Sequence, residues 1–192
     1  MPLTRFNRSG LPVTPWKNGG GTTSEIVCQP AGANMDSFDW RVSIAHIASD
    51  GPFSAFPGVD RVITLLDGAG VRLHTPDGHI DHRLDQPLAP FAFAGEAPVQ
   101  ADLLGGDCHD FNVMTRRAGW RASVAVLQAD ADLPTRAQGL LYAVRGRWTT
   151  SGGHTLQAHE GLWWHDTPTR WSLHRETADA ALIAVLIERT TP

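Results

Sequence analysis

The sequence predicts an all-β protein built from two related halves, and three observations lead to this prediction. The chain spreads 19 glycines and 13 prolines over its 192 residues, with short apolar alternations between them, as is typical of many short strands. No segment shows a helical period of convincing length. Finally, two short sequence patterns recur at nearly the same offset, which indicates an internal duplication.

Strand faces can be assigned where the alternation is clean. Successive side chains of a strand point to opposite sides, so Trp40, Val42 and Ile44 share one face of a predicted strand. Arg41 and Ser43 share the other face. One face of this strand is therefore apolar and the other is polar.

A second alternating strand is predicted over residues 109–116, with Asp110, Asn112 and Arg116 on one face. Further strands are expected at 62–66, 71–74, 80–84, 88–93 and 99–104. Residues 178–188 suit either a helix or a buried closing strand, and their run of Ile, Val and Leu favours the strand.

The duplication depends on two pairs of segments. Residues 120–125 repeat the pattern of residues 40–45, and residues 140–146 repeat that of residues 62–68. The offsets are eighty and seventy-eight residues. We therefore expect an N-terminal half over 1–118 that carries the candidate site, and a C-terminal half over 119–192 that lacks the long loops.

Composition and charge exclude several classes of function. The net charge is −4 and no segment is a basic run, so nucleic acid is not expected as a partner. The longest apolar run is far shorter than the roughly 20 residues of a spanning helix, so we expect no membrane partner. The N-terminus lacks the apolar core of a signal peptide, which favours a cytoplasmic protein. Two cysteines, expected to be reduced, are too few for a disulfide framework.

Lys17 is the only lysine of the chain, and it lies between a tryptophan and three glycines. A small ammonium group beside backbone that a ligand can approach closely is a candidate contact for an anion. Asn18-Gly19 followed by further glycines is also a strong hairpin signal, so a plain turn is the alternative. Lys17 precedes the glycines, whereas a phosphate-binding loop places its lysine after them, which argues against nucleotide binding.

The other candidate residues are polar side chains in mainly apolar strands. On an outer face they would be ordinary solvated residues, whereas inside a barrel they must be paired, because burying an unpaired guanidinium is costly. Several cations with a few acids and amides suit a small organic anion held by bidentate arginine contacts. The candidate ligand-binding residues are Lys17, Asn18, Gly19, Gly20, Glu25, Arg41, Ser43, Arg61, Asp110, Asn112 and Arg116.

The nine histidines form no recognised metal motif, since no H-x-H or H-E-x-x-H pattern occurs. His74 and His82 would meet only across a hairpin, and surface decoration is the favoured interpretation. Cys108 and His109 are neighbours on a strand and point to opposite faces, which argues against a catalytic pair. We expect no metal, no cofactor and no catalytic residue.

Several motifs together resemble the HutD/Ves family, and the likeness covers nearly the whole chain. They are Pro15 to Gly21, Trp40 to Ala45, Gly51 to Ser54, Phe56 to Arg61, Phe93 to Glu96 and Asp110 to Arg117. The resemblance implies a cupin fold of the RmlC-like jelly-roll type, with two packed β-barrel halves. Metal-binding cupins carry an H-x-H…E set with a later histidine, which this sequence lacks. A metal-free cupin would bind its ligand with organic side chains.

The resemblance also implies a function in histidine utilisation. Family members are thought to moderate expression of the pathway by binding an intermediate such as formylglutamate or urocanate, and not by catalysis. We expect a small-molecule-binding protein, with a dicarboxylate or acyl amino acid as ligand and a homodimer as a possible assembly. One alternative is a metal-independent isomerase or lyase that uses Glu25, Asp110 or His109 as acid or base. Another is an interaction module with an interface formed by tryptophans such as Trp163, Trp164 and Trp171.

Overall fold

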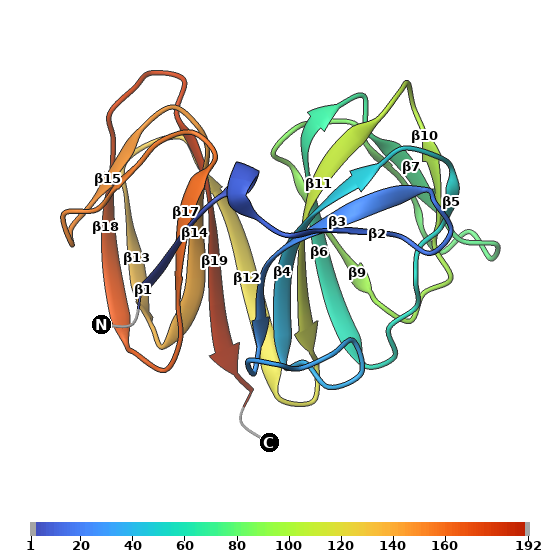
Figure 1. Ribbon diagram of the computed structural model, residues 1–192, viewed down its shortest axis with the longest axis horizontal. Helices are drawn as coiled ribbons and strands as arrows, with labels where there is room; N and C mark the ends of the chain where they lie inside the picture. The colour runs from blue at the N-terminus through green and yellow to red at the C-terminus, as the bar shows by residue number, and fades with distance from the viewer. Residues whose placement is uncertain (1–2, 191–192) are drawn as a thin grey trace. The chain divides into compact units, whose positions relative to one another are not determined.

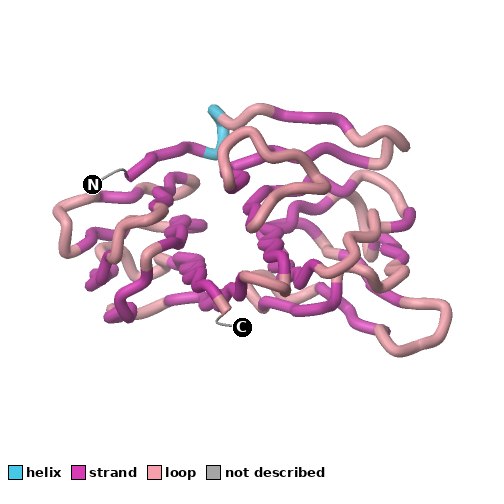
Figure 2. The backbone as a smooth tube through the Cα atoms, turned by 90° about the horizontal axis from the view of Figure 1, so that it is seen from below, coloured by secondary structure: helices cyan, strands magenta, loops and turns pink. Residues whose placement is uncertain are grey.

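The computed structural model describes residues 3–190, whose regular structure is almost entirely β-strand (Figure 1). The one helical element in that range is a short 3-10 turn, η1 (Arg8–Gly10), drawn in cyan among magenta strands in Figure 2. The all-β prediction is confirmed. The strands form an N-terminal unit, Pro12–Trp120, and a C-terminal unit of residues 3–11 and 121–189.

The N-terminal unit contains a six-stranded sheet that carries most of the predicted site residues. Its strands, in spatial order, are β2 (Val13–Pro15), β3 (Gly21–Gln29), β4 (Trp40–Ile47), β11 (Cys108–Arg116), β6 (Val59–Gly68) and β9 (Pro90–Ala94). Strand β11 lies between β4 and β6 and pairs antiparallel with both, so that Asn112 lies opposite Ser43 on one side and Ile63 on the other. This register brings residues from distant parts of the sequence into one row.

A four-stranded sheet forms the second layer of the N-terminal unit. Its strands are β5 (Gly51–Pro52), β10 (Gln100–Leu103), β7 (Val71–His74) and β8 (Asp81–Leu84). Ile63 and Leu65 of β6 share one buried cluster with Val71 and Leu73 of β7. Because the two ladders are separate, the unit is a cupin-like sandwich and not one closed barrel.

The C-terminal unit repeats this plan with fewer strands. Its first sheet consists of β1 (Leu3–Asn7), β17 (Glu160–Trp164), β14 (Gln138–Arg145), β19 (Ala181–Arg189) and β12 (Trp120–Leu127). Its second sheet consists of β13 (Ala131–Arg136), β18 (Thr169–Arg175), β15 (Trp148–Thr150) and β16 (Thr155–Leu156). The sequence left the segment 178–188 between helix and strand; its residues 181–188 belong to β19, so the segment forms a strand and not a helix.

The strand orders show the internal duplication directly. The order β4-β11-β6-β9 of the N-terminal unit recurs as β12-β19-β14-β17, and β5-β10-β7-β8 recurs as β13-β18-β15-β16. The segments that echo each other in the sequence, at the start of β4 and of β12, hold corresponding places. The duplication inferred from two short patterns therefore extends to eight pairs of strands.

The first strand does not belong to the unit that the sequence led us to expect, which was an N-terminal half over residues 1–118. Strand β1 pairs antiparallel with β17, from Leu3 opposite Trp164 to Asn7 opposite Glu160, and so belongs to the C-terminal unit. In Figure 1 the dark blue β1 accordingly runs beside the orange β17. A strand at the edge of a sheet leaves backbone groups unpaired, and β1 covers that edge of β17. The N-terminal unit instead adds β3 and β2 beyond β4.

Candidate functional site

Five predicted site residues lie inside the N-terminal unit. Arg41, Ser43, Arg61, Asp110 and Asn112 are all buried, with at most 7% of their surface exposed. Strand alternation places them on the same faces as members of the apolar cluster between the sheets, such as Ile47, Ile63 and Cys108. The sequence did not determine whether the polar faces of these strands point to solvent or to the interior, and the structure shows that they point to the interior.

Arg41 forms an ion pair with an acid that reaches the surface. Its Nε donates to Glu25 Oε2 at 2.7 Å, and its Nη1 donates to Ser43 Oγ at 3.3 Å. The Glu25 side chain is 43% exposed and that of Arg41 only 8%, so the ion pair runs from solvent into the unit. Glu25 lies opposite Ser43 in the β3–β4 ladder, which explains why the three side chains meet. Arg41 is therefore already neutralised within the protein.

Arg61 is buried without a neutralising partner. Its Nε and Nη2 donate only to Asn112 Oδ1, over a long 3.4 Å each, and it forms no ion pair with any carboxylate among residues 3–190. Burial lowers the pKa of Arg61 to about 10, against the opposing effect of Asp110, so the group stays cationic at neutral pH. Most of the donors of this guanidinium remain available.

Three phenylalanine rings surround the guanidinium of Arg61. Its central carbon lies 5.1 Å from the ring centres of Phe53 and Phe93 and 5.7 Å from that of Phe56. Attraction between a cation and a ring face stabilises the charge in this dry position. The sequence interpretation missed these rings, although Phe53 and Phe56 lie in the loop that leads into Arg61.

Asp110 is the buried acid of the group. Only 2% of its surface is exposed, and its Oδ1 has no hydrogen-bond donor among the described residues. Burial raises the pKa of Asp110 to about 7, and Arg61 offsets the increase only in part. Asp110 lies one inward position along β11 from Asn112, to which the guanidinium of Arg61 reaches. The interior therefore holds a cation and an acid close to each other but not joined.

The Lys17 loop does not join this group. The loop connects β2 to β3 as a tight hairpin, in which the Trp16 backbone N–H donates to Gly21 O and that of Gly19 donates to Trp16 O. Gly21 lies opposite Ile47, six residues along β4 from Arg41, which corresponds to about 20 Å of strand. Lys17, Asn18 and Gly19 are exposed. The structure thus separates the loop from the buried cations.

The glycines of the hairpin serve the fold and do not clear space for a ligand. A Cβ at Gly20 would lie 2.8 Å from Ser49 Oγ, and one at Gly21 would lie 2.1 Å from the backbone oxygen of His46. Gly19 has a positive φ of 73°, which favours glycine at this turn. The backbone oxygen of His46 and the side chain of Ser49 thus lie where side chains at positions 21 and 20 would be.

Arg116 is also outside the buried group. Its Nε donates to Phe38 O at 3.0 Å and its Nη2 donates to Asp36 O at 2.9 Å, with the guanidinium over the Phe38 ring. The neighbouring Arg117, which the sequence analysis did not single out, binds Glu96 through two bonds of 2.9 and 3.1 Å and Asp60 at 2.8 Å. Both arginines therefore fasten loops.

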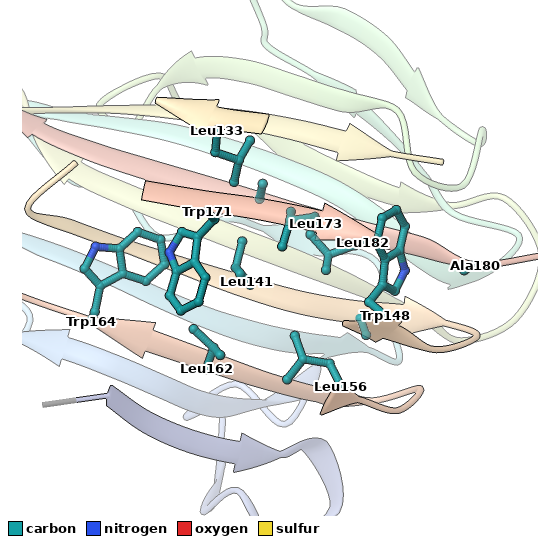
Figure 3. Packing of buried hydrophobic residues seen from close by; sticks show 12 residues of the cluster. Leu133, Leu141, Trp148, Leu156, Leu162, Trp164, Trp171, Leu173, Ala180 and Leu182 are labelled. Atoms are coloured by element: carbon teal, nitrogen blue, oxygen red, sulfur yellow. The ribbon is translucent and has the colours of Figure 1, made fainter. Parts of the chain in front are cut away.

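The corresponding interior of the C-terminal unit is filled with apolar side chains. Twelve buried residues form one cluster there, including Trp148, Trp164 and Trp171 (Figure 3). By register, Gly139 occupies the place of Arg61, and Trp164 lies opposite it as Phe93 lies opposite Arg61. A Cβ at Gly139 would lie 2.6 Å from the Trp164 ring, so the indole takes the space that Arg61 takes in the other unit.

The same register replaces two further polar residues of the N-terminal unit by apolar ones. Leu182 corresponds to Asp110, and Ala184 corresponds to Asn112. Because Trp164 and Trp171 are core residues with at most 2% exposure, they are not available for the interface that the sequence left as an alternative. Among the described residues, buried arginine and aspartate side chains occur only in the N-terminal unit, whereas the buried polar residues of the C-terminal unit are the neutral Gln138, Thr150 and Thr169.

No group of three or more metal-ligating side chains lies together within residues 3–190. His74 and His82 do not meet, since His74 binds Asp102 at 3.0 Å and His82 stacks on Phe91. No helix in the described part of the chain is long and apolar enough to cross a membrane. The chemistry at hand is that of charged and polar organic groups: Arg61 can donate to a carboxylate, and Asp110 can accept or donate a proton.

Comparisons with known proteins agree with the fold and with the sequence motifs. A family model described as HutD matches residues 8–183. Protein Ves of Cronobacter sakazakii is 41% identical over 162 residues, which cover 84% of this chain and 86% of that protein. The structure of HutD from Pseudomonas fluorescens SBW25 matches with a TM-score of 0.87 and 29% identity, over 98% of this chain and all of that one. A cupin 2 conserved barrel domain protein from Leptotrichia buccalis, at 8% identity and a TM-score of 0.62 over 96% of each chain, shares the fold alone.

Proposed function

Since the chain belongs to the HutD/Ves family, we propose that it is a cytoplasmic small-molecule-binding protein that modulates histidine utilisation. Its N-terminal unit binds an anionic intermediate of that pathway, of the formylglutamate or urocanate class. Binding, and not turnover, is the activity of this site. The C-terminal unit, whose interior is apolar, is a structural partner in the same chain.

The observation that carries this proposal is that Arg61 is buried without a carboxylate partner among the described residues. A buried guanidinium normally has a carboxylate or several hydrogen-bond acceptors around it, because desolvating a charge without them is costly. Arg61 has one amide oxygen at 3.4 Å and three aromatic rings, and no ion pair within the described chain. A ligand carboxylate would supply two acceptors in the planar arrangement that a guanidinium matches.

The rest of the interior defines what surrounds the carboxylate. The phenylalanine rings exclude water and favour a flat or unsaturated ligand next to the guanidinium. Ser43, Asn112 and the Arg41–Glu25 pair offer further polar contacts for the remainder of the molecule. This combination suits a small acid with an additional polar group, such as an acyl amino acid.

Calorimetry with formylglutamate, glutamate and urocanate tests the proposal. Arg61→Met keeps an unbranched apolar side chain among the rings of Phe53, Phe56 and Phe93, here called the phenylalanine box, and removes the charge. We expect this variant to weaken binding by about 1.5–3 kcal/mol, as for a lost charge-assisted bond. Lys17→Ala is the matched control and should change the affinity by less than about 0.5 kcal/mol, as for a surface substitution. If Lys17→Ala weakens binding and Arg61→Met does not, the ligand binds at the hairpin. If none of the three acids binds at millimolar concentration, the proposal is wrong.

A metal-independent isomerase or lyase is the second candidate, and Asp110 is the observation that favours it. A buried carboxyl group whose pKa is near 7 can both take up and release a proton at neutral pH, as a general acid–base requires. Following the same three acids by NMR in the presence of the protein decides between binding and turnover. Any new product that depends on Asp110 would establish the enzyme.

A further inference from the structure

The structure assigns Asp110 a direct role in ligand recognition: we propose that Asp110, in its protonated form, donates a hydrogen bond to the same ligand carboxylate that Arg61 binds. If Asp110 is ionised before binding, the protein takes up one proton from solvent for each ligand carboxylate that it binds. This inference rests on the proposed function and specifies how its site selects an acid.

The geometry places the two groups near each other on the inner face of the six-stranded sheet, with no bond between them. Arg61 extends from β6 along the inner face to Asn112 of β11, and Asp110 follows Asn112 at the next inward position of that strand. The two side chains form no ion pair, although each is the strongest charged influence on the other. Asp110 Oδ1 is fully buried and receives no hydrogen bond from residues 3–190. A carboxylate between them would satisfy both.

Charge balance then requires the proton. Two carboxylates that share a buried site with one free guanidinium cannot both be ionised at low cost, because like charges in a dry interior repel each other strongly. The ligand carboxylate is in contact with Arg61, so Asp110 is the acid that keeps its proton. Its O–H points at the ligand as the donor, and the proton comes from solvent.

No other charged group near Asp110 can take over this role. Arg41 on β4 is paired with Glu25 on β3. On β11 itself, burial raises the pKa of Cys108 to about 12, so that thiol stays neutral. The facing four-stranded sheet contributes apolar side chains to the interior, namely Val71, Leu73, Leu84 and Ala101. His109 lies on the opposite face of β11, where its Nδ1 bonds Asp67 Oδ1 at 2.6 Å.

Titration of the isotope-labelled protein with sodium formate, followed by NMR at the Arg61 Nε–H, tests the inference. Formate stays ionised between about pH 5.5 and about pH 8.5, so any change in its affinity over that range belongs to the protein. We expect the dissociation constant of wild type to be flat below about pH 6 and to rise about tenfold per pH unit above about pH 7. Proton uptake on binding, measured by calorimetry in two buffers of different ionisation enthalpy, should follow the same curve.

Two variants identify the group that titrates. Asp110→Asn keeps an N–H donor at the same place and cannot ionise, so its affinity for formate should stay constant within about twofold over the whole range. His109→Gln removes the histidine next in sequence and should keep the wild-type slope. A wild-type affinity that does not change with pH, or a slope that persists in Asp110→Asn, would overturn this inference and leave the proposed function intact. If neither formate nor formylglutamate binds at any pH, both are wrong.

Discussion

At the scale of single residues, Asp110 determines how the stability of the fold depends on pH. Its carboxyl group is removed from water, and burial raises its pKa from an ordinary 3.8 to about 7. The folded state therefore holds a proton that the unfolded chain releases between about pH 4 and about pH 7. It follows that the contribution of Asp110 is most favourable in acid and is lost as the pH rises through that window. Above about pH 7 the folded protein contains an ionised acid with little compensation.

Replacing Asp110 by asparagine should remove its contribution to the pH dependence of folding stability. We expect Asp110→Asn to have the stability of wild type near pH 4 and to exceed it by a few kcal/mol above about pH 7, at about 1.4 kcal/mol per unit of pKa difference. Urea unfolding from pH 4 to pH 8 measures the effect. Curves for the two proteins that run parallel over this range would contradict it.

At the scale of elements, the hairpin between β2 and β3 shows how a conspicuous motif can serve the fold. Gly21 starts β3 directly against the end of β4, with the backbone of His46 where a side chain would be. The Trp16 indole donates its Nε1–H to Thr23 Oγ1 at 2.8 Å and packs against the core cluster. The run of glycines is thus required by close packing of two backbones and by one left-handed turn residue.

Gly21→Ala tests that role of the hairpin. Because the added Cβ would meet a backbone oxygen, which cannot rotate away, we expect a loss of about 1–3 kcal/mol or more in the free energy of unfolding. Gly119→Ala is the control, since a Cβ there meets nothing within 4 Å and its φ is not in the left-handed region. Thermal unfolding of both variants measures the difference. Equal stability of the two would show that the hairpin can move away from β4.

At the scale of the whole molecule, the two units share a strand order and differ in what fills them. The pair Arg61 and Phe93 of the N-terminal unit corresponds to Gly139 and Trp164 of the C-terminal unit. With these two differences, the interior of the N-terminal unit is charged and partly without hydrogen-bond partners, whereas that of the C-terminal unit is densely packed with apolar side chains. Duplication thus supplied two similar frames, of which one could specialise in stability and the other in binding.

This divergence predicts the stoichiometry of binding. Calorimetry with formylglutamate should give one site per chain, because the buried cations among residues 3–190 all lie in the N-terminal unit. Arg61→Met should weaken binding at that single site without exposing a second one. Two sites per chain, or an affinity that this substitution leaves unchanged, would contradict the assignment.

The sequence was sufficient for the fold class, for the internal duplication and for the grouping of polar side chains on strand faces. Alternation correctly placed Arg41 with Ser43, and Asp110 with Asn112, because a strand has a period of two whatever its surroundings. Alternation cannot show whether a polar face points to solvent or to a core, and that decision required the second sheet. Lys17 drew attention by its rarity, but the place of a turn in space depends on register over the whole of β3 and β4. The phenylalanine box was missed because Phe53, Phe56 and Phe93 come from loops and an edge strand that meet only after folding.

The pairing of β1 with β17 sets the order in which the chain can be completed. All strands of the N-terminal unit lie in one continuous segment, Pro12–Trp120, which can assemble as soon as it has left the ribosome. The C-terminal unit instead needs strand β1, which is made first, to pair with strand β17, which is made more than 150 residues later, since Leu3 pairs with Trp164. Contacts of such long sequence separation close late and slowly. During synthesis the strands of the N-terminal unit are therefore complete before residues 160–164, with which residues 3–7 pair, have been made.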